Sequence, residues 1–228
     1  MSGQRKELLQ NVYQTLYDAF GPLSWWPAQT PFEVILGAIL TQNTAWRNVA
    51  KAIANLRENN VLSFPAICEV PASSLALLIR SSGFYNEKAK KVKSFCQHIL
   101  TEWEGSLDRF LAQETEALRS ELLGIRGIGP ETADSITLYA AFKPSFVVDA
   151  YTFRIFSRHG WIDETIGYDE LRDYFMSALE PDVPIYQEYH ALLVRTGHLY
   201  CRRKALCQSC PLNVFFDGSG LRSAPPMD

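Results

Sequence analysis

The chain has 228 residues, of which 47% are hydrophobic and 21% are charged, and its formal net charge is −3 at pH 7. This composition is ordinary for a folded globular protein and excludes a disordered chain. The small excess of acidic residues gives no indication of a polyanionic partner. No apolar stretch reaches the ~18 residues that a membrane span needs, and the first residues lack the apolar core of a secretory signal. With an odd number of cysteines as well, we expect a cytoplasmic protein.

Apolar residues recur at helical spacing along nearly the whole chain. Leu8 to Phe20 form one face of a first helix, which Gly21 and Pro22 end, and residues 31–40 are apolar nearly all round, as in a buried helix. Thr44 is expected to cap a third helix. Further helices are expected over residues 72–79, 87–103, 107–112, 115–122, 131–142, 150–159, 168–179 and 185–199. No segment alternates as a half-buried strand does, so the fold class is mainly α.

Two glycines flank a single apolar residue in Gly127-Ile128-Gly129. Glycine permits positive φ and the close approach of another backbone, and Pro130 suits the first turn of the helix that follows. The free N–H groups of such a turn can hold a phosphate oxygen without any net positive charge on the protein. A plain corner between two helices is the alternative interpretation.

A carboxylate follows a short apolar run at the predicted start of a helix. Asp149 comes directly after Val147 and Val148. Aspartate at this position is a common N-cap, and it also offers an ionised oxygen for chemistry. Taken alone, the residue is compatible with either role.

Together these features resemble the helix-hairpin-helix DNA glycosylase superfamily, the endonuclease III group, from about residue 8 to residue 212. That family has a hairpin of the form L-x-G-[VI]-G, a residue two positions after the second glycine that defines the catalytic type, and a catalytic aspartate eighteen residues further on. The corresponding residues here are Glu131 and Asp149, and Ile125 stands where the leucine is expected. The resemblance implies a two-domain helix-hairpin-helix DNA glycosylase fold with the active site in the interdomain cleft.

The resemblance also implies a domain organisation and a partner. Residues 22–132 would form a six-helix barrel domain that ends in the helix-hairpin-helix. Residues 1–21 and 133–216 would form a second helical domain, and residues 217–228 a flexible tail. The partner would be double-stranded DNA that contains damaged bases, bound by a monomer. The residues expected at the DNA are Gln42, Arg126, Gly127, Ile128, Gly129 and Thr132.

The segment from Leu40 to Thr44 resembles the family pattern L-[ST]-x-Q-x-T, although Gln42 comes one position early. In the family this glutamine is inserted into the DNA at the gap left by the flipped base. The resemblance implies the same role for Gln42.

Members that also cut the DNA strand have a lysine at the position of Glu131, because a Schiff base with the sugar requires an amine. A carboxylate cannot form one, so the resemblance predicts a monofunctional glycosylase, which leaves an abasic site. Asp149 would stabilise the oxocarbenium-like charge at C1′ or activate a water. Glu131 either positions water or caps and solvates its helix.

Adjacent tryptophans follow a glycine–proline break at Trp25-Trp26-Pro27. They either fill the core between two layers or form a stacking wall for a flipped base, with Trp46 as a second wall. The combination resembles the bacterial 3-methyladenine DNA glycosylase III type, in which these positions line the base pocket. An electron-rich pocket of this kind suits cationic alkylated purines.

Three cysteines, Cys201, Cys207 and Cys210, follow the last long helix. Endonuclease III relatives hold a [4Fe–4S] cluster on C-x6-C-x2-C-x5-C, but here the first spacing is one residue short and Phe216 replaces the fourth cysteine. The alternatives are a cluster completed by Asp217, His198 or water, a zinc site, or no metal. The residues Arg202, Arg203 and Lys204 in this loop are either phosphate contacts or a solvated basic loop.

We therefore expect a monofunctional DNA glycosylase for alkylated purines such as 3-methyladenine. One alternative is a glycosylase for mismatched or deaminated bases, which predicts hydrogen-bonding groups in the pocket, or an endonuclease III-like enzyme with another lesion range. A non-catalytic protein that binds DNA structure is a third.

Overall fold

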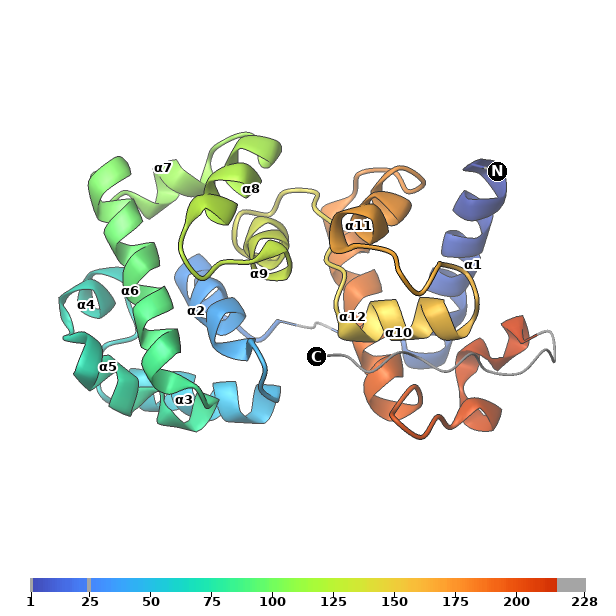
Figure 1. Ribbon diagram of the computed structural model, residues 1–228, viewed down its shortest axis with the longest axis horizontal. Coiled ribbons are helices and arrows are strands. Elements are labelled where there is room, and N and C mark those ends of the chain that lie inside the picture. The colour runs from blue at the N-terminus through green and yellow to red at the C-terminus, as the bar shows by residue number, and fades with distance from the viewer. Residues whose placement is uncertain (1, 24–25, 217–228) are drawn as a thin grey trace. The chain divides into compact units, whose positions relative to one another are not determined.

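The computed structural model describes residues 2–23 and 26–216, and helices dominate it (Figure 1). No strand occurs among these described residues, so the prediction of a mainly α fold is confirmed. Trp25, Asp217 and the rest of the C-terminal tail, on which some of the expectations above depend, lie outside the described residues. No helix in the described part of the chain is both long and apolar enough to cross a membrane.

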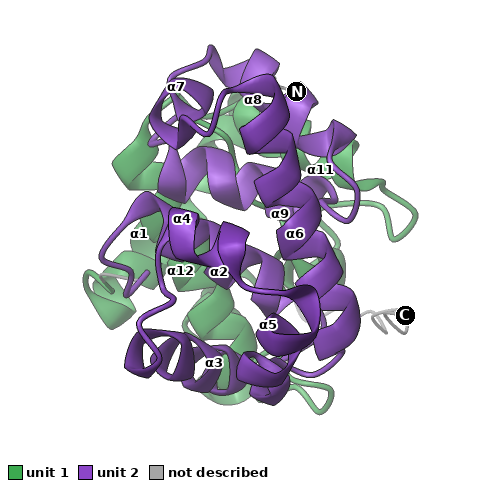
Figure 2. Ribbon diagram, turned by 90° about the vertical axis from the view of Figure 1, so that its left-hand side faces the viewer, with its two compact units in different colours: residues 1–25, 144–228 green, residues 26–143 purple. Residues whose placement is uncertain are grey.

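The chain divides into two compact units, coloured separately in Figure 2. Unit 1 comprises residues 1–25 and 144–228, and unit 2 comprises residues 26–143. Unit 1 contains α1 (Ser2–Phe20), α10 (Ala150–Arg158), α11 (Tyr168–Met176), α12 (Val183–Leu199) and the short turns η3 (Cys207–Ser209) and η4 (Pro211–Phe215). Unit 2 contains α2 (Pro31–Thr41), α3 (Trp46–Glu58), α4 (Phe64–Glu69), α5 (Ala72–Leu78), η1 (Arg80–Ser82), α6 (Tyr85–Glu102), α7 (Leu107–Leu111), α8 (Thr115–Gly124), α9 (Pro130–Ser135) and the π-helical η2 (Ile136–Ala140).

The unit boundaries lie later in the chain than those expected at residues 21/22 and 132/133. The reason is that α9 continues directly into η2, which packs against α2. In addition, the ring of Tyr139 in η2 lies 4.8 Å from that of Trp26, centroid to centroid. Residues 133–143 are therefore held by unit 2.

Aromatic side chains fill the core of unit 1. Phe146 stacks on Phe175 with ring centroids 4.1 Å apart, and the ring of Tyr189 meets both in edge-to-face contacts. The hydroxyl of the fully buried Tyr189 donates to the carbonyl of Leu9 at 2.9 Å, which joins α12 to α1. The first helix of the chain thus belongs to the same compact unit as its C-terminal part.

Helix α2 is the buried centre of unit 2. Every residue from Phe32 to Leu40 is buried, as expected from a sequence that is apolar nearly all round. Thr30 begins the helix by accepting a bond from the Glu33 amide at 3.2 Å. The charge of the buried Glu33 is paired with Arg57 of α3.

One sequence expectation in unit 2 is wrong, and one helix of unit 2 was not predicted. Thr44 does not cap α3, because the chain turns at Thr41–Thr44, with the Thr44 amide bonded to the Thr41 carbonyl at 3.1 Å, and the helix begins after Ala45. The short α4 was not expected. It is a brief helix that begins at Ser63, whose hydroxyl accepts from the Ala66 amide, and a short segment of this kind carries little periodic signal.

Candidate active site and DNA interface

The hairpin between α8 and α9 is shaped by Gly127. Its φ is +93°, a left-handed conformation that favours glycine, and a Cβ here would lie 2.4 Å from Cγ of Lys91. Ile128 is buried, and its amide donates to the carbonyl of Ile125 at 3.0 Å. Glycine is therefore required at position 127 for two reasons: its backbone angle, and the Lys91 stem that lies against it.

An ion pair ties together the two helices of the hairpin. Nε of Arg119 in α8 donates to Oδ1 of Asp134 in α9 at 2.8 Å, and its Nη2 donates to Oδ2 at 3.2 Å. Asp134 is completely buried. A bidentate pair of this geometry fixes orientation as well as distance, so it holds the hairpin at one angle.

Gln42 is bonded to the same hairpin. Its Nε2 donates to the carbonyl of Gly127 at 3.2 Å and to Oγ1 of Thr132 at 2.9 Å, and its Oε1 accepts from Nζ of Lys91. Thr132 is itself buried. The structure thus brings three of the predicted residues together through the Gln42 amide, and adds Lys91, which the sequence did not single out.

Asp149 is the N-cap of α10. Its Oδ1 accepts from the amide of Thr152 at 2.8 Å and from its Oγ1 at 2.9 Å. Its Oδ2 lies 3.8 Å from Nε2 of His190 in α12. Burial on its own would raise the pKa of Asp149, but His190 and the two Thr152 donors outweigh it and hold that pKa below its usual range. The carboxyl group is therefore ionised at neutral pH.

The other two polar residues predicted at the hairpin lie at its surface. Arg126 is exposed in the turn, and Glu131 is exposed in the first turn of α9. An acidic side chain there suits the partial positive charge of a helix N-terminus. Both positions are accessible, which is compatible with contact to DNA or to solvent.

An aromatic cluster lies over Gly37 of α2. The Trp26 ring meets the ring of Trp46 edge to face at 5.6 Å and tilts against the ring of Tyr139 at 4.8 Å. A Cβ on Gly37 would lie 3.3 Å from Trp26 Cζ2 and 3.5 Å from Trp46 Cη2, so the glycine gives the indoles room to approach the helix. Trp46 is 38% exposed, and Pro27 is also exposed. Tyr139, which the sequence did not single out, completes the cluster.

The indole N–H of Trp26 stands out within this cluster. Its Nε1 is buried and has no hydrogen-bond partner among the described residues. Buried polar groups in proteins are nearly always bonded, so this donor is compatible with an acceptor on a bound molecule.

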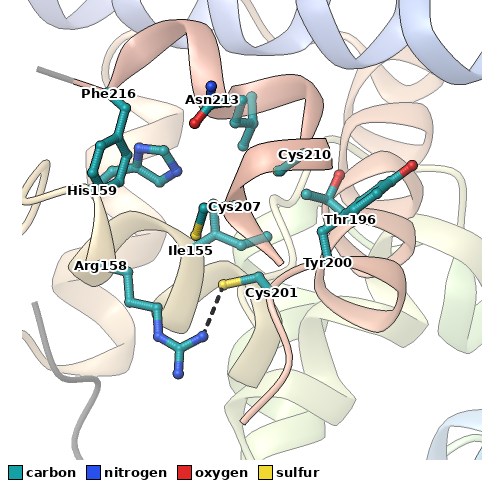
Figure 3. Close-up of a pocket in the computed structure, with 11 residues that line it drawn as sticks. Ile155, Arg158, His159, Thr196, Tyr200, Cys201, Cys207, Cys210, Asn213 and Phe216 are labelled. Atoms are coloured by element: carbon teal, nitrogen blue, oxygen red, sulfur yellow. Dashed lines mark hydrogen bonds between the residues drawn. The ribbon is translucent and has the colours of Figure 1, made fainter. Parts of the chain in front are cut away.

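The three C-terminal cysteines line one pocket, shown in Figure 3. The fourth position of the cluster pattern is the ring of Phe216, which meets His159 edge to face at 5.9 Å. Burial raises the pKa of the Cys210 thiol to about 11, and that of Cys207 is also raised. No group of three His, Cys, Asp or Glu side chains in the described ranges is placed to hold a metal ion. The donor set therefore does not fit the four thiolates that a [4Fe–4S] cluster takes.

Two arginines of α10 hold the cysteine loop instead. Nη1 of Arg158 lies 3.4 Å from Sγ of Cys201 (Figure 3). The same Nη1 donates to the carbonyl of Arg202 at 2.6 Å, and Nη2 donates to the carbonyl of Arg203 at 3.3 Å. Nε of Arg154 donates to the carbonyl of Cys201 at 2.6 Å. His198, which the sequence suggested as a ligand, does not line this pocket; the histidine that lines it is His159, which the sequence did not suggest.

The side chains that sequence reasoning missed are those that act across long separations. They are Lys91, Tyr139, His190 and Arg158, and each contacts a predicted residue that is 36 or more positions away along the chain. Each lies on a helix with no local pattern that marks it. Only the register of the folded helices places them beside Gln42, Trp26, Asp149 and Cys201.

Residues 36–181 match the profile of the HhH-GPD superfamily of base excision DNA repair proteins. The chain is 46% identical over 216 residues to the protein named "Putative DNA repair glycosylase MJ1434" of Methanocaldococcus jannaschii, with 94% of this chain and 98% of that protein covered. It is 28% identical over 186 residues to endonuclease III of Sulfolobus acidocaldarius, with 81% of this chain and 80% of that protein covered.

Among solved structures, the fold is similar to that of Helicobacter pylori 3-methyladenine DNA glycosylase (MagIII) bound to 1,N6-ethenoadenine. The TM-score is 0.72 and the identity is 30%, over 86% of this chain and 97% of that chain.

Proposed function

The chain belongs to the HhH-GPD superfamily of base excision DNA repair proteins and is a DNA repair glycosylase; from that premise we propose that it hydrolyses the N-glycosidic bond of alkylated purines such as 3-methyladenine. Its substrate would be damaged double-stranded DNA, which it would bind as a monomer. The observation that carries the proposal is the aromatic cluster of Trp26, Trp46 and Tyr139. The similar structure of the H. pylori enzyme, by its name and its bound base, supports the same substrate class.

The aromatic cluster favours recognition by charge. A purine alkylated at N3 carries positive charge, and the faces of indole and phenol rings attract cations, most strongly when the cation is desolvated. A cationic base is also a good leaving group and needs little help from an acid. The enzyme's main task is then to hold the flipped base and to stabilise the sugar.

Asp149 is suited to stabilising the sugar. Its Oδ1 is occupied by the two Thr152 donors, so Oδ2 is the oxygen that we assign to the reaction. An ionised oxygen near C1′ stabilises the oxocarbenium-like charge that develops as the bond to the base breaks. It can also accept a proton from the water that completes the hydrolysis. We assign the exposed Glu131 to the solvation of its helix or to the placement of that water.

We propose that the enzyme is monofunctional. The position that would carry the Schiff-base lysine is Glu131, and a carboxylate cannot form an imine. The stem of Lys91 lies against Gly127 of the hairpin, and its amine is already bonded to Oε1 of Gln42. No step of the proposed reaction uses the cysteine pocket.

A second candidate function rests on the buried indole N–H of Trp26. A donor in the base pocket suits the carbonyl oxygen of a deaminated base such as uracil or hypoxanthine. That candidate predicts release of neutral bases and a strong dependence on the Trp26 N–H.

The experiment is base release from defined duplexes. Alkylated DNA and duplexes containing uracil or hypoxanthine are incubated with the protein, and the released bases are identified by chromatography. Release of 3-methyladenine that Asp149→Asn abolishes supports the proposal. Asp182→Asn is the matched control, because Asp182 is also an N-cap aspartate of unit 1 and accepts from the Ile185 amide at 2.8 Å. Release of neutral bases alone would transfer the assignment to the second candidate.

Strand cleavage is tested on the same DNA. A monofunctional enzyme leaves intact abasic strands and no product that borohydride traps on the protein. A trapped covalent species would overturn this part of the proposal, and Lys91→Met would then show whether Lys91 supplied the amine.

A further inference from the structure

A buried glycine near the end of α12 lies against the first turn of α10. Glycine is among the least favourable residues within a helix, so the presence of Gly197 there needs another explanation. A Cβ at this position would lie 2.3 Å from Cδ1 of Tyr151 and 2.7 Å from both its Cγ and its Cβ. The ring could rotate away from such an atom, but the Cβ of Tyr151 moves only with its backbone. A larger side chain at position 197 would therefore push the start of α10 away from α12.

Tyr151 is also held by a residue of its own helix. The guanidinium carbon of Arg154 lies 4.9 Å from the centre of the Tyr151 ring, which is a cation–π contact. Nε of the same arginine donates to the carbonyl of Cys201, just beyond the end of α12, at 2.6 Å. No hydrogen bond of the Tyr151 hydroxyl occurs among the described residues. The ring is therefore the part of Tyr151 that joins the two helices.

The same two helices hold the proposed catalytic carboxylate. Asp149 comes two residues before Tyr151, and His190 comes seven residues, or about two helical turns, before Gly197. His190 and Gly197 therefore lie on one face of α12, the face that meets α10. Oδ2 of Asp149 lies 3.8 Å from Nε2 of His190 at the separation of the helices that the glycine permits.

The contacts of Asp149 respond differently to that separation. His190 is the titratable group on a neighbouring element that acts on Asp149 within the described part of the chain, and the other favourable contacts come from Thr152 of its own helix. The two Thr152 bonds move with α10, whereas the contact with His190 does not. A movement of α10 away from α12 would therefore weaken the His190 contact and leave the N-cap bonds in place.

We propose that Gly197 and Tyr151 are positioning residues for the catalytic carboxylate, and that their close contact sets the separation at which Oδ2 of Asp149 lies beside His190. The inference rests on the proposed function for the catalytic role of Asp149. The contact itself belongs to the packing of unit 1, so it can be measured without any substrate.

The test is a double-mutant cycle on the titration of Asp149. The carboxyl carbon of this residue is followed by NMR across the acidic pH range and assigned with Asp149→Asn. In the otherwise unchanged protein, His190→Ala should raise the pKa of Asp149. In a Gly197→Ala background the same substitution should have much less effect, because the contact that it removes is already weakened. The acid limb of kcat/KM should follow, since a rise of one pKa unit lowers activity on the acid side about tenfold.

Gly167→Ala is the matched control in unit 1. The only atom within 4 Å of a Cβ at Gly167 is Oε2 of Glu170, at 3.8 Å, so alanine fits there without a movement of the backbone. In the Gly167→Ala background, His190→Ala should keep its full effect on the pKa of Asp149. An effect as small as in the Gly197→Ala background would show that the coupling responds to any alanine in unit 1, and it would overturn the proposal.

Substitutions of Tyr151 separate its ring from its hydroxyl, and they provide the same measurement if Gly197→Ala does not fold. Tyr151→Phe keeps the ring, so the effect of His190→Ala on Asp149 should be that seen in the unchanged protein. Tyr151→Ala removes the ring that fixes the separation, so the effect should be reduced. If Tyr151→Phe reduced base release as much as Tyr151→Ala did, the hydroxyl would be a substrate contact and the positioning role would be overturned.

The result also separates the positioning role from the proposed function. If the wild-type protein releases no base but the coupling of Asp149 to His190 depends on Gly197 and on the Tyr151 ring, the proposed function fails and the positioning role stands. If base release is intact and His190→Ala changes the pKa of Asp149 equally with and without Gly197→Ala, the positioning role is overturned.

Discussion

Nε2 of His190 lies 3.8 Å from Oδ2 of Asp149, and both side chains are nearly buried. Burial alone would disfavour the carboxylate, so the ionised state of Asp149 depends on His190 and on the Thr152 donors. This contact joins α12 to the N-terminus of α10, and it links the charge of the proposed catalytic oxygen to a residue 41 positions away.

Replacing His190 should move the acid limb of the activity profile. In His190→Ala the histidine no longer counteracts the effect of burial on Asp149. The pKa of Asp149 therefore rises, and a smaller fraction of this carboxyl group is ionised at a given acidic pH. The fall in kcat/KM with decreasing pH should therefore begin at higher pH than in the wild type. Because the pKa of Asp149 is lower in the folded protein than in the unfolded chain, its ionised form stabilises the folded state. This stabilisation is present above the unfolded pKa and is lost as the pH falls through the folded pKa. His190→Ala should therefore lose less stability than the wild type on acidification.

Histidine 198, on the same helix, provides the control. His198 is exposed, and His198→Ala should leave the profile in place. An acid limb that is identical in His190→Ala and the wild type would show that the contact does not set the state of Asp149.

Lys88 should give the protein a measurable pH dependence at alkaline pH. Burial lowers its pKa from 10.5 to about 8. Between these two values the unfolded chain binds more protons than the folded one, so this group makes stability rise with pH. In Lys88→Met the free energy of unfolding should not show this rise with pH. The variant should also be less stable by about 1–3 kcal/mol, because two buried carbonyls lose their hydrogen-bond donor. Urea unfolding from pH 7 to pH 10.5 measures both effects. Lys90 is an exposed neighbour, so the stability of Lys90→Met should depend on pH as that of the wild type does. If stability plotted against pH ran parallel for Lys88→Met and the wild type, the prediction would be contradicted.

Gly127→Ala should destabilise unit 2 by roughly 1–3 kcal/mol. Alanine disfavours the positive φ. Its Cβ would also lie only 2.4 Å from Cγ of Lys91, so the Lys91 stem would have to move. Gly129→Ala is the matched variant in the same turn, because a Cβ there has no neighbour within 4 Å and the φ is negative. Thermal melts of the two variants should differ clearly, and equal melting temperatures would refute the strain argument.

Trp26→Phe should discriminate between the two substrate classes. The substitution keeps an aromatic ring in the cluster and removes the buried N–H. If the pocket selects cationic purines, the rate of 3-methyladenine release should fall by less than about tenfold, since a cation–π contact contributes about 1 kcal/mol or more and a phenyl ring retains part of it. Single-turnover rates provide the measurement. A much larger loss, together with loss of neutral-base release, would favour recognition by hydrogen bonding.

The cysteine loop should be stable without metal and sensitive to Arg158. Arg158→Met removes the donors to the carbonyls of Arg202 and Arg203, so we expect a loss of about 1–3 kcal/mol. Treatment with chelator should leave the melting temperature unchanged. Lys204→Met, at an exposed position of the same loop, is the control. A brown protein with bound iron, or a melting temperature that falls on chelation, would contradict this prediction.

The sequence predicted features that depend on local chemistry. The nearly continuous apolar run of α2, the paired glycines of the hairpin and the aspartate at the start of α10 can each be recognised from a few neighbouring residues. The turn before α3 was predicted less well, because Thr44 and Ala45 are both acceptable before a helix and the choice depends on a bond to Thr41.

The remaining parts of the candidate site depend on packing between distant segments. Helix α6 contains four lysines, of which Lys88 is buried and Lys91 is bonded to Gln42, and nothing in their local sequence separates these two from Lys90. A lysine is ordinarily expected at the surface. Only the register of α6 against α2 and η1 decides which amine turns inward.

Unit 1 is assembled from both ends of the chain, with unit 2 inserted between its parts. During synthesis unit 2 is complete once residue 143 has emerged, and it can fold while the rest is still being translated. Helix α1 must wait for α12, since the hydroxyl of Tyr189 bonds a carbonyl 180 residues earlier. Asp149 and His190 both belong to this later unit, so a nascent or truncated chain would acquire the hairpin well before it could acquire the proposed catalytic carboxylate in its bonded form.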